Sequence, residues 1–321
     1  MKIRSCIGIA VLFLATECLF GYGSYGAANE SPGADHDSAA NENAAANKKL
    51  TIAQAIVLGL IEGATEYLPV SSTGHLLIYQ HAAGISETGE DSRASDALAI
   101  CIQSGAILAV VMLYFGRLRQ IIQGVLGGNP EGLRLLGLLI VAFFPAAVVG
   151  LLFNDWIRQH LFGIPAVAAA LFTGGLLILA VAGRLNASTP GRELHEISWT
   201  GALKIGTLQC LAFWPGFSRS LAAILGCRWA GMKLTAAVEF SFLLGLVTLS
   251  AATAYEGLKH GSEMIDQYGY VAPSVALVTA FLSAVISVRF MVTLLNRRGL
   301  APFGYYRIVL AVLCVVLIFL R

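Results

Sequence analysis

Apolar residues dominate the chain from Leu50 onward, in runs long enough to cross a membrane. A helix needs about 20 predominantly apolar residues to span a bilayer core of ~30 Å. Runs of this length predict about six membrane-spanning helices, over residues 95–115, 133–153, 164–184, 235–256, 271–295 and 303–320. The pattern therefore predicts an all-α polytopic membrane protein.

Two further apolar regions, 51–84 and 199–232, are interrupted in the middle by proline. The first contains Pro69, and the second contains Pro215 followed by Gly216. Proline removes a backbone donor and clashes with the preceding helical turn, so each region divides into two pieces. Each piece is too short to cross the bilayer. We expect two re-entrant helix pairs, each of which enters and leaves the membrane on the same side.

The order of the segments predicts an inverted repeat. Residues 50–184 and 199–320 each contain one re-entrant pair followed by three spans, and Pro69–Thr73 matches Pro215–Arg219 in position. Because three is an odd number of spans, the second half must be inverted relative to the first. Inverted repeats with broken helices place their ligand site near the middle of the membrane, between the halves.

The N-terminus has the pattern of an addressing segment. Two basic residues precede an apolar run, and small residues follow up to Ala28, so residues 1–28 resemble a secretory signal. An uncleaved extra helix is the alternative. Residues 29–49 are polar and lack apolar periodicity, which predicts a disordered linker. The membrane domain is expected over 50–321.

Charge is scarce and unevenly placed. Charged residues make up 12% of the chain against 57% hydrophobic residues, and the net charge is +2, which excludes a nucleic-acid binder. Basic residues concentrate in the loops on the cytoplasmic side of membrane proteins. This rule places three loops in the cytoplasm, marked by Arg117, Arg119, Arg134, Arg184, Arg192, Arg297, Arg298 and Arg307. The loops 154–163 and 257–270 then lie outside, and so does the opening of the first re-entrant pair.

The first candidate site is the polar segment Glu62–His75. Glu62 and Glu66 are four residues apart and therefore share one helix face. A charged side chain at bilayer depth costs about 2.5–3.5 kcal/mol, so both carboxylates should face a wet cavity. There they would share a proton or a cation. The alternative is a structural hydrogen-bonding pair between helices.

Three hydroxyl residues follow the break at Pro69. Ser71, Ser72 and Thr73 stand where the second helix of the pair begins, and the free amides of a helix start can bind an anion. His75 lies about one helical turn beyond Ser72, which predicts that it acts as the base for that hydroxyl.

The second candidate site is Pro215–Ser220, where Arg219 stands between Ser218 and Ser220. A guanidinium group matches two phosphate oxygens at once. Two helix starts that meet inside the membrane, one of them carrying an arginine, predict a site for phosphate on a hydrophobic carrier. The alternative is an arginine that only neutralises the glutamates.

These two segments resemble the signature motifs of the undecaprenyl-pyrophosphate phosphatase (bacitracin-resistance) family, over about residues 50–320. Leu221 stands where that family usually has glycine, and Val247 where it often has proline. The resemblance implies an enzyme that hydrolyses undecaprenyl pyrophosphate to the monophosphate and so recycles the carrier lipid of cell-wall synthesis. The family's essential residues fall on Glu62, Glu66, Ser72, His75 and Arg219.

The resemblance also implies a place and a cofactor. It implies a bacterial inner-membrane enzyme with a site that faces the periplasm, and dependence on a divalent cation, Mg²⁺ or Ca²⁺. Glu62 and Glu66 are the predicted metal ligands, and Ser71, Thr73, Ser218, Arg219 and Ser220 are the predicted phosphate-binding residues. A flippase for the lipid phosphate is the competing function, since inverted re-entrant repeats also build transporters. Whether Ser72 or a water attacks, and whether the protein forms a homodimer, stays open.

Overall fold

The computed structural model describes residues 50–83, 90–161, 163–183 and 190–319. The predicted signal-like segment 1–28 and linker 29–49 lie outside these ranges. The elements of the described part are α3 (Ile52–Thr65), α4 (Ser72–Ala82), α5 (Glu90–Leu113), α6 (Phe115–Val125), α7 (Pro130–Leu161), α8 (Ile164–Ala182), η1 (Leu194–Glu196), α9 (Trp199–Gln209), η2 (Cys210–Phe213), α10 (Arg219–Trp229), α11 (Leu234–Tyr268), α12 (Val271–Arg298) and α13 (Ala301–Phe319).

The helices are those of a polytopic membrane protein, which confirms the predicted fold class. By length and composition, four helices of the described residues can each cross a bilayer: α7, α8, α11 and α12. A fifth span is formed if α5 and α6 count as one, although the chain bends by 79° between them. The sixth predicted span corresponds to α13, whose apolar stretch in the described part, Ala301–Val316, is shorter.

Three segments expected to be loops are helical. The basic segment after residue 115 forms α6, while α7 continues to Leu161 and α11 to Tyr268. The continuation of α11 has a local cause, because this part of the chain contains no proline before Gly269, and its glycines, Gly257 and Gly261, each cost a helix only about 1 kcal/mol. There the backbone turns left-handed (φ 67°), and the Gly269 amide donates to the Ile265 carbonyl, which closes the helix end. Helices therefore extend past the apolar residues that define the spans.

Both predicted re-entrant pairs are present. The first is α3 and α4, which are separated by residues 66–71, and the second is α9 with η2 and α10, which are separated by residues 214–218. We call residues 66–72 the first tip and residues 214–220 the second tip. Each tip contains the proline that the sequence marked as the break.

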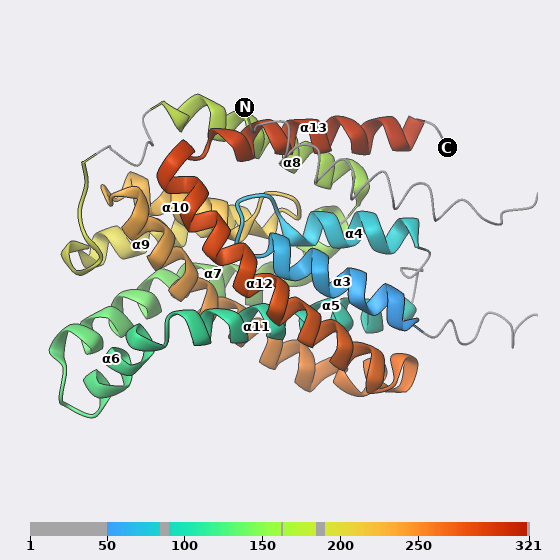
Figure 1. Ribbon diagram of the computed structural model, residues 1–321, viewed down its shortest axis with the longest axis horizontal. Coiled ribbons are helices and arrows are strands. Elements are labelled where there is room, and N and C mark those ends of the chain that lie inside the picture. The colour runs from blue at the N-terminus through green and yellow to red at the C-terminus, as the bar shows by residue number, and fades with distance from the viewer. Residues whose placement is uncertain (1–49, 84–89, 162, 184–189, 320–321) are drawn as a thin grey trace, which may run out of the picture.

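The two pairs open at opposite ends of the helix bundle. At one end, Arg192 and Gly231 are joined by a backbone hydrogen bond of 2.8 Å, which brings the entry of α9 beside the exit of α10. At the other end, Leu50 packs in one cluster with Met264 and Tyr268 near the end of α11. Figure 1 shows α3 and α9 entering from these opposite ends and converging on the centre. This arrangement is the one that an inverted repeat requires.

Equivalent features recur at a constant distance of 147 residues. Helix α3 begins after the capping residue Thr51 and α9 after Ser198. Gly59 approaches the carbonyl of Ala276 on α12, and Gly206 approaches that of Ala142 on α7, each so closely that a Cβ would lie 2.3 Å from the oxygen. Non-glycine residues with positive φ, among those described, are Ser71 and Ser218. The structure therefore shifts the predicted alignment by one residue, so that Ser72 and Arg219 are equivalent.

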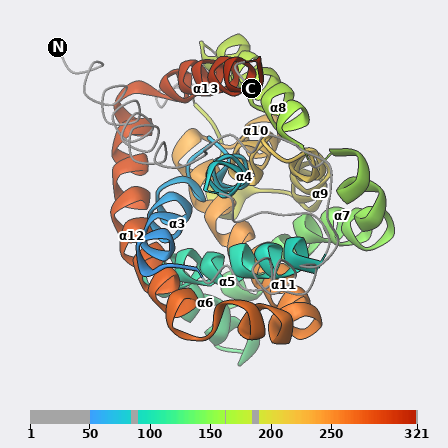
Figure 2. The same cartoon turned by 90° about the vertical axis from the view of Figure 1, so that its right-hand side faces the viewer.

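Helix packing also follows the repeat, because helices of one half pack against helices of the other. Helix α3 packs on α12 as α9 packs on α7, while α5 pairs with its counterpart α11 and α8 with its counterpart α13. Figure 2 shows α4 near the centre of a ring formed by these helices. The two tips are thus enclosed by spans from both halves.

Candidate active site

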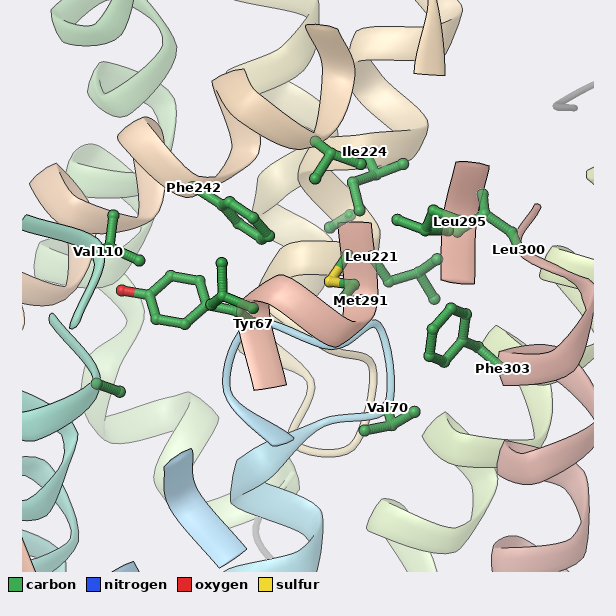
Figure 3. Packing of buried hydrophobic residues seen from close by; sticks show 14 of the residues in the cluster. Tyr67, Val70, Val110, Leu221, Ile224, Phe242, Met291, Leu295, Leu300 and Phe303 are labelled. Atoms are coloured by element: carbon green, nitrogen blue, oxygen red, sulfur yellow. The ribbon is translucent and has the colours of Figure 1, made fainter. Parts of the chain in front are cut away.

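The two tips touch each other inside the bundle. The Ser220 hydroxyl of the second tip donates to the Leu68 carbonyl of the first at 2.8 Å. Around them, Tyr67 and Val70 share an apolar cluster with Leu221 of α10 and with side chains of α12 and α13 (Figure 3). The contact brings together the two polar segments that the sequence singled out, which lie about 150 residues apart in the chain.

A strained serine precedes the outgoing helix at each tip. Ser71 has φ 74° and Ser218 has φ 81°, in the left-handed region that L-residues rarely adopt. The side chains explain why serine is used here rather than glycine. Ser71 Oγ accepts a hydrogen bond from the Gly74 amide at 3.3 Å, and Ser218 Oγ accepts one from the Leu221 amide at 3.3 Å. The next residues, Ser72 and Arg219, become the first residues of α4 and α10.

Glu66 joins these two residues. Its Oε2 accepts a short hydrogen bond from the Ser72 hydroxyl, and its Oε1 forms an ion pair of 2.7 Å with Arg219 Nη2. The side chains of Glu66 and Arg219 are only 5% and 12% exposed. A buried ion pair needs hydrogen bonds on its remaining atoms to offset desolvation, and Ser72 supplies one.

Arg219 is held on several sides but keeps one donor free. Its Nη1 donates to the Ser241 carbonyl at 3.1 Å, and its guanidinium carbon lies 5.2 Å from the centre of the Tyr67 ring. Its Nε is buried and has no partner in the structure. Gly245 makes room for the group, because a Cβ there would lie 2.1 Å from Nη1. The guanidinium is therefore fixed in place, with Nε as a buried donor that has no partner.

Glu62 lies one turn before Glu66, as predicted, and is equally buried. Its carboxylate interacts with Glu66 and with Gln103 of α5, and its Oε1 has no hydrogen-bond partner. Two adjacent buried carboxylates are stable only if a proton or a cation lies between them. No group of three or more His, Cys, Asp or Glu side chains suited to a metal occurs in the described residues. Any cation here would depend on this pair and on neutral oxygens.

The predicted pair of Ser72 and His75 is not formed. The Ser72 hydroxyl is directed to Glu66, whereas the nitrogens of His75 face the Ser71 carbonyl and the Tyr306 hydroxyl, each at 2.6 Å. The imidazole also stacks on the Tyr306 ring, with centroids 5.7 Å apart. His75 therefore contacts the first tip and α13 but not the hydroxyl that it was expected to deprotonate.

The remaining hydroxyls divide into two kinds. Ser218 and Ser220 lie 3.0 Å apart and are engaged by the tips themselves, Ser218 as a helix cap and Ser220 across to Leu68. Thr73 is exposed, which leaves its hydroxyl open to a ligand. Of the predicted phosphate-binding residues, Thr73 is exposed and Arg219 has a nitrogen without a hydrogen-bond partner.

Sequence reasoning misplaced one residue and overlooked its neighbour. Arg307 was expected to mark a cytoplasmic loop but is fully buried in α13, where it donates to carbonyls of both tips. Tyr306 precedes it and holds His75. The signal was available, because a lone arginine inside an apolar run indicates a functional position.

The two departures from the family pattern lie in packed regions. Leu221 is fully buried in the cluster around the tips, and Val247 packs against the cluster between α7, α9 and α11. Of the two, Leu221 takes part in the hydrogen bonds described above, through its backbone amide, which donates to Ser218 Oγ.

Comparisons with known proteins identify the family of the chain. The family model "Bacitracin resistance protein BacA" matches residues 55–313. An undecaprenyl-diphosphatase of Sorangium cellulosum is 44% identical over 81% of this chain and 84% of its own length. Undecaprenyl-diphosphatase 2 of Rhodospirillum rubrum is 43% identical, over 79% of this chain and 90% of its own. The chain therefore belongs to the bacitracin-resistance protein BacA family.

Proposed function

We propose that the protein is a membrane phosphatase that hydrolyses undecaprenyl pyrophosphate to undecaprenyl phosphate and inorganic phosphate, and so recycles the carrier lipid of cell-wall synthesis. The observation that carries the proposal is the single carboxylate, Glu66, which binds a hydroxyl from one tip and a guanidinium from the other. A nucleophile, a proton acceptor and a phosphate-binding cation are the groups that cleavage of a phosphoanhydride needs. The relatives reported above carry the name of this activity.

Arg219 is the proposed phosphate-binding group. Its Nε has no partner, and its Nη2 is now paired with Glu66. If Nη2 exchanges Glu66 for the substrate, both nitrogens can donate hydrogen bonds to one phosphate. The starts of α4 and α10 lie beside it, at Ser72 and Arg219, and helix starts favour anions. The terminal phosphate would thus be held between both tips.

Glu66 is the proposed proton acceptor. The Ser72 hydroxyl already donates to it, so Glu66 can take the proton when Ser72, or a water in its place, attacks the terminal phosphorus. The bond from phosphorus to the bridging oxygen then breaks, and undecaprenyl phosphate leaves. If Ser72 attacks, a water must afterwards hydrolyse the phosphoserine. His75 would support the first tip through Ser71 rather than deprotonate Ser72.

The residues fit a divalent cation. The unpartnered Oε1 of Glu62, the carboxylate of Glu66 and the amide of Gln103 are oxygens of the kind that Mg²⁺ and Ca²⁺ bind. A cation bound there would neutralise charge on the phosphate groups. We propose Glu62 and Glu66 as its protein ligands.

The site's surroundings suit a lipid substrate at the periplasmic side of the inner membrane. The outer helices expose many large apolar side chains, such as Leu151, Leu152 and Ile286, so a prenyl chain could stay in the bilayer while its head group enters. The first re-entrant pair opens at the end that the charge pattern assigns to the periplasm.

Phosphate release from undecaprenyl pyrophosphate by the purified protein tests the function. We expect release that stops with a chelator and returns with Mg²⁺ or Ca²⁺, and that falls in Ser72→Ala. The matched control is Ser250→Ala, at an exposed position on α11. Absence of release by the wild type, together with movement of labelled lipid phosphate across vesicles, would favour the flippase instead.

A further inference from the structure

Arg307 is a buried cation that belongs to neither polar segment. It lies on α13 with 0% of its surface exposed. Its Nη1 donates to the Pro69 carbonyl at 3.2 Å, and its Nη2 donates to the carbonyls of Gly216 at 2.8 Å and of Ala170 at 3.1 Å. A single guanidinium therefore holds the first tip, the second tip and α8.

The partners of Arg307 are neutral. The described residues offer it no carboxylate within ion-pair distance, and its Nε has no hydrogen-bond partner. A buried charge without a counter-charge is costly, and it persists only where its contacts are needed. Broken helices leave such carbonyls unpaired inside a membrane, and Arg307 pairs one from each tip.

The neighbouring helix is shaped around this side chain. Gly174 of α8 lies against the guanidinium, and a Cβ there would be 2.2 Å from Nη2 and 2.8 Å from the central carbon. The adjacent Tyr306 contacts His75. One short stretch of α13 thus contacts both tips and the histidine of α4.

We propose that Arg307 is a positioning residue that fixes the two tips relative to each other, so that Arg219 meets Glu66 and Ser72 in reactive geometry. The Pro69 carbonyl lies three residues before Ser72, and the Gly216 carbonyl lies three residues before Arg219. A change in the length or direction of either bond moves one reactive residue against the other. The inference rests on the proposed phosphatase function.

The substitution Arg307→Lys separates a positioning role from simple stabilisation of the fold. Arg307→Lys keeps the charge but has one nitrogen, which cannot reach three carbonyls in the fixed fork of a guanidinium. Misplacement of reacting groups by about 1 Å can cost about 100-fold in rate. We expect kcat of the folded variant to fall about 10–100-fold while KM changes by less than about threefold, because Arg219 still binds phosphate.

Gly174→Ala tests the same geometry with Arg307 intact. Its methyl group would displace the guanidinium, and we again expect a loss of kcat of about 10–100-fold, with KM changed by less than about threefold. The matched control is Gly257→Ala on α11, where a Cβ meets nothing within 4 Å, and its kcat should equal that of the wild type. If Arg307→Lys does not fold, Gly174→Ala alone decides.

The readouts are kcat and KM per folded molecule, with folding checked by thermal denaturation and size-exclusion chromatography. Wild-type kcat in both folded variants would overturn the positioning role, and so would losses explained entirely by less folded protein. An inactive wild type would instead overturn the proposed function, which the same assay reports separately.

Discussion

The two tips have the same backbone but opposite chemistry. Each places a serine in the left-handed conformation, caps the next helix with its hydroxyl and then presents one residue of the proposed site. That residue is Ser72 in the first tip and Arg219 in the second. The helix before the first tip carries Glu62, whereas the equivalent position in α9 is Gln209, which has no charge. The repeat thus supplies two equivalent backbone turns. The side chains differ, so that the first half of the site carries the carboxylates and the second half carries the guanidinium.

The largest effect is expected where the two halves meet. Glu66→Gln keeps the size of the side chain but removes both the negative charge that pairs with Arg219 and the proposed proton acceptor for Ser72. Loss of a general base costs about 10²–10⁴-fold, and kcat should fall by that much. Phosphate release measures it, with the half-exposed Glu263→Gln as the control. Nearly normal turnover would show that the carboxylate of the first tip does not take part in the chemistry.

A smaller loss is expected from the second tip. Arg219→Lys keeps the charge but cannot contact Glu66, the Ser241 carbonyl and a phosphate together, so kcat/KM should fall at least about tenfold. Gly245→Ala should act in the same direction by displacing the guanidinium. The exposed Arg119→Lys is the control. Equal activity of Arg219→Lys and wild type would show that Arg219 contributes only its positive charge.

The support of the first tip by α13 should matter less. Tyr306→Phe keeps the stacked ring but loses the hydroxyl that contacts His75, which is worth about 1 kcal/mol, or roughly fivefold in kcat. His75→Ala should make this loss disappear in the double variant, since both changes affect one contact. Additive losses in kinetic measurements would place the role of Tyr306 elsewhere.

The opposed entry of the two tips can be tested without affecting turnover. Leu126 lies between α6 and α7 and is 80% exposed, while Tyr270 lies between α11 and α12 and is 72% exposed. Cysteines placed at these positions in a cysteine-free background should react with an impermeant maleimide from opposite sides of the membrane. Activity should stay at the level of the background protein. Reaction of both from one side would exclude an inverted arrangement.

Sequence patterns predicted the parts of this molecule that follow from local physics. The lengths of the apolar runs predicted the membrane spans, and the prolines predicted the breaks at both tips. The spacing of Glu62 and Glu66 predicted that they share one helix face. Each of these depends on residues within one or two helical turns. The resemblance to a known family added the expected roles of these residues, and those roles stay predictions.

The missed features depend on contacts between distant segments. The apolar run around Arg307 marks it as a candidate functional residue, but its partners are known only once α13 packs against both tips. Likewise, His75 contacts Tyr306, which lies 231 residues further along the chain. The repeat register was wrong by one residue because the prolines, not the strained serines, guided the alignment. Backbone conformation at Ser71 and Ser218 carries no signal that hydrophobic periodicity can detect.

The glycines beside the two arginines have a consequence for how the sequence can vary. Helices α8 and α11 are composed largely of interchangeable apolar residues, yet Gly174 and Gly245 each face a guanidinium at a distance that no side chain allows. A library that replaces the apolar positions of these helices at random should tolerate change along most of their length. In cells whose growth depends on this protein to recycle the carrier lipid, selection should retain glycine at these two positions. The reason is that each glycine contacts an arginine of another helix, Arg307 for Gly174 and Arg219 for Gly245.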